Sequence, residues 1–212
     1  MDHEKWLAYA REIYTLSQSG LTYNAKPFHE DEDAFDIERY RRLQEISAEI
    51  IAQHSLLATE EVMSTFAMQR GYPTPKVDVR GAIVQNGKIL MVKELADGRW
   101  SMPGGWADIG ESAAEMVIRE VKEESGFDVK IDKLVGVFNN NRSEPRDLFH
   151  AYKLVFLCTI IGGEARGSYE TLQVGFFPLS QLPILSTSRT NQRILDEVMA
   201  HYNNPSRTAF YE

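Results

Sequence analysis

The stretch from Gly105 to Phe127, which reads GWADIGESAAEMVIREVKEESGF, constrains the fold more than any other part of the sequence. Ser112 and Glu115 have the spacing of a capping box, in which the serine oxygen accepts a backbone N–H and the glutamate reaches back to the cap. Gly126 stands where a left-handed residue ends a helix. The stretch therefore predicts a helix over residues 113–125, with a glycine-rich loop before it.

Three acidic side chains share one face of this predicted helix. Glu120, Glu123 and Glu124 are three and four positions apart, a spacing that places side chains next to one another. Their position near the helix C-terminus costs stability, because the helix dipole disfavours each negative charge there by about 0.3–1 kcal/mol. We therefore expect a cation on this face, and a hard cation with oxygen ligands is the simplest candidate. The alternative is a solvated acidic face.

The residues around the helix favour a binding site over a solvated face. Gly104, Gly105 and Gly110 give the preceding loop a backbone that can approach a phosphate closely. Glu111 closes this loop and can point into the same site, and Arg119 can hold a neighbouring carboxylate in place.

The stretch resembles the Nudix box, whose pattern is G-x5-E-x7-R-E-U-x-E-E-x-G-U, with U a bulky apolar residue. Every fixed position is filled, by Gly105, Glu111, Arg119, Glu120, Val121, Glu123, Glu124, Gly126 and Phe127. The resemblance implies an α+β protein with a Nudix α/β/α sandwich and a mixed sheet. It also implies hydrolysis of a nucleoside diphosphate linked to another group X, with Mg²⁺ as cofactor or Mn²⁺ in its place.

The resemblance also implies roles for individual residues. The implied metal ligands are Glu111, Glu120, Glu123, Glu124 and Gly105. Arg119 would orient the carboxylates, and the catalytic base would be Glu123, Glu124 or Glu170. Glu170 lies in a predicted loop whose counterpart in many Nudix enzymes carries the base or a further metal ligand. The alternative for Glu170 is an exposed loop acid.

Substrate contacts are expected from three further positions. Gly104 belongs to the loop that approaches the phosphates, and Trp106 in the same loop can stack on a base or on X. Arg80 lies early in the first predicted strand, where related proteins place a substrate-contacting or ion-paired arginine. A core aromatic residue and a structural ion pair are the alternatives for Trp106 and Arg80.

The chain divides into a helical part and a part rich in strands. We expect three helices in residues 1–71 and a Nudix domain in residues 77–206. Between them, residues 72–76 are expected to form a linker, because two prolines prevent regular structure there. We expect the helices at about 4–19 with Gly20 as its end, at Asp36–Gln53, and after Thr59 with Gly71 as its stop. Strands are expected at 77–85, 88–92, 128–138, 149–161 and 174–177, and a last helix at 189–202.

The N-terminal part resembles the helical extension of a two-domain bacterial Nudix group, which includes CDP-choline pyrophosphatases and proteins labelled ADP-ribose pyrophosphatase. The residues that carry this resemblance are Trp6, Ala10, Tyr23, the stretch 35–39, the stretch 71–80 and the stretch 103–108. It implies a homodimer in which the extension contributes to the interface.

The composition limits the kinds of partner and the cellular location that we expect for this chain. The 212 residues carry a formal net charge of −8, which argues against non-specific binding to long nucleic acid. The single cysteine, Cys158, permits no intramolecular disulfide and favours a reducing cytoplasm. The sequence begins with a charged segment unlike a signal peptide, and no run approaches the length of a membrane span.

Other functions compatible with the box are a sensor that holds ADP-ribose or a nucleotide without turnover, and a hydrolase acting on RNA ends. A sensor normally lacks some of the box glutamates, and none is lacking here. The identity of X stays open at this point, between ADP-ribose and CDP-choline.

Overall fold

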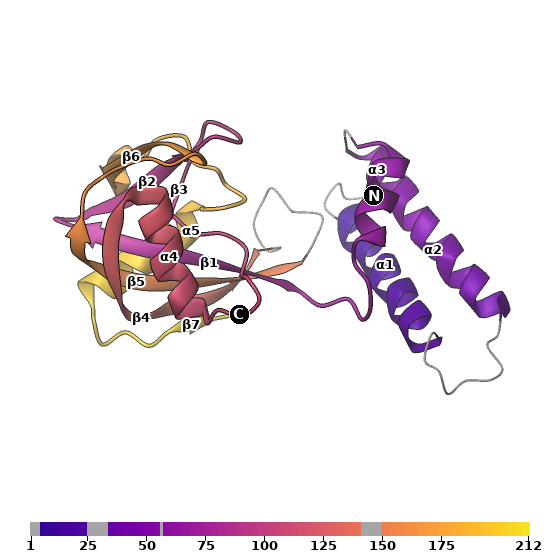
Figure 1. The fold of residues 1–212 in the computed structure, drawn as a ribbon. Coiled ribbons are helices and arrows are strands. Elements are labelled where there is room, and N and C mark those ends of the chain that lie inside the picture. Colours follow the sequence, from indigo (N-terminus) through magenta and orange to yellow (C-terminus); the bar gives the residue numbers. More distant parts are fainter. Residues whose placement is uncertain (1–4, 25–33, 56, 141–149) are drawn as a thin grey trace. The chain divides into compact units, whose positions relative to one another are not determined.

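The computed structural model describes residues 5–24, 34–55, 57–140 and 150–212 (Figure 1). Residue 149, the first of a predicted strand, lies outside this described part. The chain forms two compact units, Met1–Thr74 and Pro75–Glu212, which we call the helical unit and the sheet unit.

The helical unit contains α1 (Lys5–Asn24), α2 (Ala34–Gln53) and α3 (Thr59–Ala67). The prediction that the first helix ends at Gly20 is wrong, because α1 continues to Asn24. A Cβ atom on Gly20 would lie 2.3 Å from Cζ of Tyr40 in α2. The glycine therefore allows the two helices to approach closely and does not end α1. Similarly, α2 begins before Asp36, which lies in its first turn.

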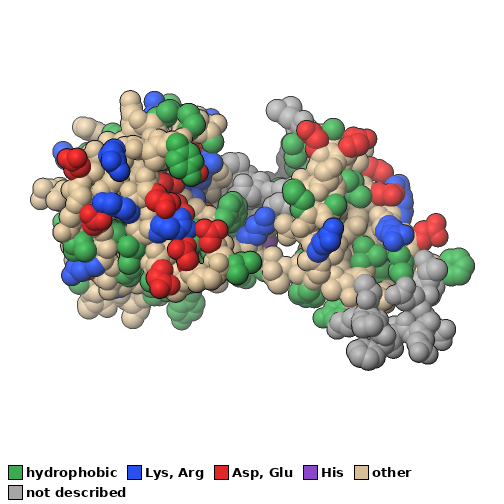
Figure 2. Space-filling view, in the orientation of Figure 1, with side chains coloured by type: hydrophobic (Ala, Val, Ile, Leu, Met, Phe, Trp, Pro, Cys, Tyr) green, Lys and Arg blue, Asp and Glu red, His purple; other side chains and the backbone are tan. Residues whose placement is uncertain are grey.

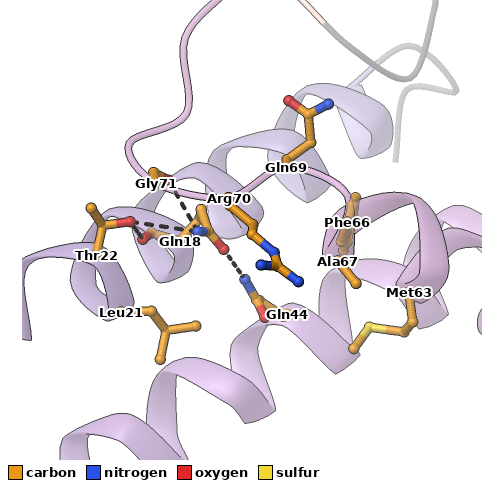
Figure 3. Close-up of a pocket in the computed structure, with 10 residues that line it drawn as sticks. All are labelled: Gln18, Leu21, Thr22, Gln44, Met63, Phe66, Ala67, Gln69, Arg70 and Gly71. Atoms are coloured by element: carbon orange, nitrogen blue, oxygen red, sulfur yellow. Dashed lines mark hydrogen bonds between the residues drawn. The ribbon is translucent and has the colours of Figure 1, made fainter. Parts of the chain in front are cut away.

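The three helices form a small core and an open pocket with both polar and apolar lining residues. Tyr14 of α1 stacks on Phe66 of α3, with ring centroids 4.0 Å apart. Beside them lies a cavity of about 310 Å³ (Figure 3). Two hydrogen bonds cross it: Gln44 Nε2 donates to Gln18 Oε1 at 2.7 Å, and Gln18 Nε2 donates to the carbonyl of Gly71 at 3.0 Å. Gln18 therefore links α2 to the segment that follows α3.

The sheet unit contains a mixed sheet whose described strands run in the order β3-β2-β1-β5-β4-β7, with β6 paired to β2. Strand β1 is antiparallel to β2 and parallel to β5. The elements are β1 (Lys76–Gln85), β2 (Lys88–Glu94), β3 (Trp100–Ser101), α4 (Ala113–Ser125), β4 (Phe127–Asn139), β5 (Ala151–Gly163), β6 (Thr171–Pro178), a 3-10 turn (Leu179–Gln181), α5 (Gln192–Asn203) and β7 (Phe210–Tyr211). The predicted α+β fold with a mixed sheet after a helical part is confirmed.

Each face of the sheet carries a helix and its own core (Figure 1). Val79 and Ile83 of β1 pack toward α4, and Ala82 of the same strand packs toward α5, as the alternation of a strand requires. Gly81 lies directly under α4, since a Cβ atom there would be 2.4 Å from Cγ2 of Val121. The missing side chain allows α4 to lie close to β1.

The predicted hairpin between the first two strands is confirmed. Asn86 and Gly87 have φ values of 51° and 72°, and Gln85 pairs with Lys88 across the turn. None of the described helices is long and apolar enough to cross a membrane.

Candidate active site

Helix α4 begins and ends as the sequence predicts. Ser112 Oγ accepts the N–H of Glu115 at 3.3 Å, and the Ser112 N–H donates to Oε2 of Glu115 at 2.9 Å. Gly126 ends the helix with φ of 81°. Because both ends are fixed, the acidic face of α4 has a defined position against the preceding loop.

The glycine-rich loop runs along β1. The N–H of Val79 donates to the carbonyl of Gly105, and the N–H of Gly81 donates to the carbonyl of Pro103, both at 2.9 Å. Gly104 has φ of 136°, and a Cβ atom there would lie 2.0 Å from the carbonyl oxygen of Val79. Only glycine therefore fits at position 104 without moving the loop.

Glu124 joins the helix to this loop. Its Oε2 accepts the Gly104 N–H at 2.9 Å, and only 5% of the residue is exposed. Burial, aided by the charges of Glu94 and Glu120, raises the pKa of Glu124 to about 8, although Arg80 and the Gly104 N–H act in the opposite direction. The ionised carboxylate thus lacks full compensation from the protein.

Arg119 gathers four other carboxylates. Its Nη1 donates to Glu120 at 3.0 Å and to Glu123 at 3.1 Å, while Nε and Nη2 bind Glu111 at 2.8–3.1 Å and Nη2 also binds Asp108 at 2.8 Å. Figure 2 shows acidic side chains gathered around basic ones on the face that carries α4. Hydrogen bonds from Arg119 lower the pKa of Glu111. The arginine therefore sets the arrangement of these acids.

A cavity of about 370 Å³ opens between the loop, α4 and the strands. Its lining carries five carboxylates and two guanidiniums. The structure places seven of the predicted site residues on this lining and leaves Glu111, Arg119 and Glu123 beside it. The lining residues are Asp78, Arg80, Glu94, Gly104, Gly105, Trp106, Glu120, Glu124, Asn140, Glu170, Ser188 and Arg189.

Comparison with known proteins identifies the family of the chain. Residues 75–198 match the family description "NUDIX domain", which is more than half of the chain. The chain belongs to the Nudix family. Residues 4–66 match a second description, "UDP-X-like, N-terminal oligomerisation domain". Residues 4–66 and 75–198 of this Nudix protein thus each match a known domain.

Named relatives cover all or about two thirds of this Nudix chain. YjhB of Bacillus subtilis, provisionally named an ADP-ribose pyrophosphatase, is 36% identical over 209 residues, which are 98% of this chain and 97% of YjhB. The crystal structure of a UDP-X diphosphatase matches with a TM-score of 0.63 and 30% identity, covering both chains fully. An ADP-ribose pyrophosphatase from Streptococcus suis matches with a TM-score of 0.61 and 37% identity, over 66% of this chain and 100% of its own.

The Nudix carboxylates fit a divalent cation in charge, although they are not yet arranged around one. Within the described part of the chain, no three His, Cys, Asp or Glu side chains form a ready-made metal group. Arg119 accounts for this, because it binds Glu120 and Glu123 while Glu124 turns to Gly104. Burial raises the pKa of both Glu120 and Glu124, so their charged forms would gain from a nearby cation.

Arg80 is bound within the protein. Its Nε and Nη2 donate to the two oxygens of Asp78 at 3.0 and 2.8 Å, and Nη1 donates to the carbonyl of Met102 at 3.1 Å. Only 3% of the residue is exposed. The arginine thus combines a structural ion pair with a place on the cavity wall, and its charge lowers the pKa of Glu124.

Trp106 and Glu170 are exposed residues of the cavity lining. Trp106 is 50% exposed, and the ammonium of Lys76 lies 5.7 Å from its ring centroid, an arrangement that leaves much of the indole open. Glu170 follows a turn in which its N–H donates to Ser168 Oγ at 3.1 Å, and its carbonyl accepts the Leu95 N–H at 2.8 Å. The backbone of Glu170 is therefore fixed while its side chain lines the cavity.

Sequence reasoning missed several polar residues at the cavity. Glu94 and Asp78 end or begin buried strands, and Ser188 and Arg189 precede the last helix. These residues lie outside the box in sequence, so the sequence alone does not show that they are close to the box residues in space. The one local signal is Lys153, a lysine inside an otherwise apolar strand, which proves to be buried beside Asp78.

Proposed function

We propose that this Nudix protein hydrolyses the phosphoanhydride bond of a nucleoside diphosphate linked to X, with Mg²⁺ as cofactor and ADP-ribose as the first candidate for substrate. The observation that carries the proposal is Glu124, a buried carboxylate with a raised pKa that is bonded to the Gly104 N–H. A divalent cation would supply the compensation that this charge lacks. The names of YjhB and of the Streptococcus suis protein favour ADP-ribose over CDP-choline.

The box residues would hold the ion and the substrate. A divalent cation held by these residues would supply positive charge for the diphosphate and would make a water molecule more acidic. Glu120, Glu123 and Glu124 would be its carboxylate ligands, with Glu111 and the carbonyl of Gly105 as further donors. Arg119 would orient these carboxylates, since it already contacts Glu111, Glu120 and Glu123.

Hydrolysis then needs a base and a position for the two phosphates. A glutamate takes a proton from a water molecule while the oxygen of that water attacks one phosphorus. The bond from this phosphorus to the bridging oxygen then breaks. Two monophosphates result, which for ADP-ribose are AMP and ribose 5-phosphate. We assign the base to Glu170, because it lines the cavity and is bound neither to Arg119 nor to Gly104, and we keep Glu123 and Glu124 as the alternatives. The indole of Trp106 would stack on the nucleobase or on X, and Gly104 would let the loop approach the phosphates.

A turnover panel tests the proposal. Purified full-length protein is given ADP-ribose, CDP-choline, a UDP-sugar and a capped RNA oligonucleotide, each with Mg²⁺ and with Mn²⁺, and the products are separated by chromatography. We expect two monophosphates from at least one nucleoside diphosphate derivative and no release without metal. Binding of a nucleotide without turnover on any substrate would contradict the proposal and favour a sensor.

Variants assign the glutamates. Glu170→Gln should lower kcat by roughly 10²- to 10⁴-fold, the usual contribution of a general base, with little change in KM. Glu123→Gln and Glu124→Gln should raise the Mg²⁺ concentration needed for half-maximal rate. Glu164→Gln is the matched control, because Glu164 is an exposed acid of the same unit outside the cavity lining. Full activity in Glu123→Gln and in Glu124→Gln would remove the metal-ligand assignment.

We also propose that the helical unit, predicted as residues 1–71, forms a homodimer interface. The support is its match to an oligomerisation domain and its exposed apolar side chains, which include Tyr9, Leu16, Tyr23, Phe35 and Met68. Light scattering should give twice the chain mass, and Leu16→Glu should lower it. Ile161→Glu is the control, since Ile161 of the sheet unit is 65% exposed and Leu16 is 63% exposed. A monomer at every concentration would contradict the proposal.

Cytoplasmic location stays a prediction, which cell fractionation can check.

A further inference from the structure

Two arginines line the cavity of the sheet unit, and the protein uses them differently. All three guanidinium nitrogens of Arg80 are bonded, to Asp78 and to the Met102 carbonyl. Arg189 keeps 32% of its side chain exposed. Its Nη1 donates to Ser186 Oγ at 2.9 Å and to Asp97 at 3.3 Å, and its Nε lies 3.6 Å from Oε1 of Glu94. Among the described residues, none forms a hydrogen bond with its Nη2.

The backbone that carries Arg189 is held rigidly at the cavity wall. Lys153 is 2% exposed, and its Nζ donates to the carbonyls of Ser188 and Arg189 at 2.9 and 2.5 Å. The same ammonium lies 3.8 Å from Oδ1 of Asp78, which pairs with Lys153 across β1 and β5. A buried lysine thus fixes the turn that bears the arginine.

The same turn is tied to the glycine-rich loop. The Ser186 N–H donates to the carbonyl of Trp100 at 2.8 Å, and the N–H of Met102 donates to Thr190 Oγ1 at 2.9 Å. Met102 immediately precedes Pro103 and Gly104. Arg189 is therefore anchored to the strand that leads into the loop expected to approach the phosphates.

The negative charge of the cavity requires a further positive group near the substrate, and the Arg189 guanidinium can supply it. Five carboxylates and two guanidiniums line it, and a diphosphate adds further negative charge. A metal ion at Glu120 and Glu124 would neutralise one side, while Arg80 has each of its nitrogens already bonded within the protein. The planar guanidinium of arginine suits phosphate oxygens, and its other nitrogens can keep their carboxylate partners meanwhile.

We propose that Arg189 is a substrate-binding residue, which donates from Nη2 to an oxygen of the substrate diphosphate while Nε and Nη1 stay on Glu94, Asp97 and Ser186. Lys153 is its positioning residue, since it holds the backbone on both sides of the Ser188–Arg189 peptide. This assignment rests on the proposed function for its substrate class.

Kinetics of Arg189→Gln and Arg189→Lys with ADP-ribose and Mg²⁺, or with the substrate that turns over fastest, test the proposal. Arg189→Gln should raise KM by roughly 10- to 100-fold, as loss of a charged hydrogen bond does, with kcat within about threefold. Arg189→Lys should raise KM by a smaller factor of at least about threefold, because a lysine keeps the charge and loses the planar donor. The KM of wild type should rise with salt more steeply than that of Arg189→Gln.

Arg166→Gln is the matched control, since Arg166 is exposed, outside the cavity lining and without a side-chain ion pair to the described residues. Titration with ADP in Ca²⁺ separates the two proposals. Loss of ADP affinity in Arg189→Gln without any turnover by wild type would uphold Arg189 and refute hydrolysis. KM and ADP affinity within twofold of wild type in Arg189→Gln would overturn the assignment. If Arg189→Gln does not fold, a KM for Arg189→Lys equal to that of wild type would overturn it.

Discussion

Replacing Glu124 by glutamine should separate the cost of a buried charge from the rest of the site. The pKa of Glu124 rises from 4.5 to about 8 in the folded protein. Between these values the folded state binds a proton that the unfolded state releases, so the free energy of unfolding falls as pH rises through this window. At about 1.4 kcal/mol for each pKa unit, the shift corresponds to a loss of roughly 5 kcal/mol by about pH 9.

Glutamine keeps an oxygen for the Gly104 N–H and cannot ionise, so Glu124→Gln should lack this loss. Metal-free wild type, Glu124→Gln and the control Glu164→Gln are unfolded by urea in EDTA, near pH 5 and near pH 9. We expect Glu124→Gln to gain several kcal/mol relative to wild type at the higher pH only, and Mg²⁺ to restore wild type there. The same stability difference at both pH values would refute the reasoning.

Three further changes follow from the geometry. Gly104→Ala should lower the stability of the sheet unit by more than about 1 kcal/mol and abolish turnover, because a Cβ atom would overlap the carbonyl of Val79; calorimetry and the turnover assay check this. Arg119→Gln should raise the Mg²⁺ requirement of the reaction about tenfold, since Glu111, Glu120 and Glu123 lose their shared partner; a rate curve against Mg²⁺ measures it, and an unchanged curve would contradict it. Gly20→Ala should destabilise the helical unit by more than about 1 kcal/mol in circular-dichroism melts, because its Cβ would meet the ring of Tyr40; equal melting would count against close packing of α1 and α2.

Local patterns in the sequence predict the centre of this site well. The capping box at Ser112 and the glycine at position 126 act within a few residues, and α4 spans Ala113–Ser125 as expected. The Asn86–Gly87 turn likewise depends only on neighbouring residues, and its positive φ values confirm the predicted hairpin. Such features depend on neighbours in sequence, so the chain itself contains the information.

Features that depend on distant contacts could not be predicted in the same way. Gly20 has the appearance of a helix end, and only the approach of Tyr40 from another helix explains its position inside α1. Lys153 and Arg189 lie 36 positions apart, and their contact follows from the parallel pairing of β1 with β5 and the turn before α5. Strand β7 pairs with β4 through two residues, too short a run to give a pattern.

Gly81 has a consequence for anyone who engineers this scaffold. A search for better strand formers would replace it with valine or threonine, and the strand itself would accept the change. The added atoms would meet Val121, on the helix that bears the acids, so the spacing between those acids and the glycine-rich loop would widen. The variant would lose stability through this overlap and activity through the displaced acids, so a gain in strand propensity would not predict its behaviour.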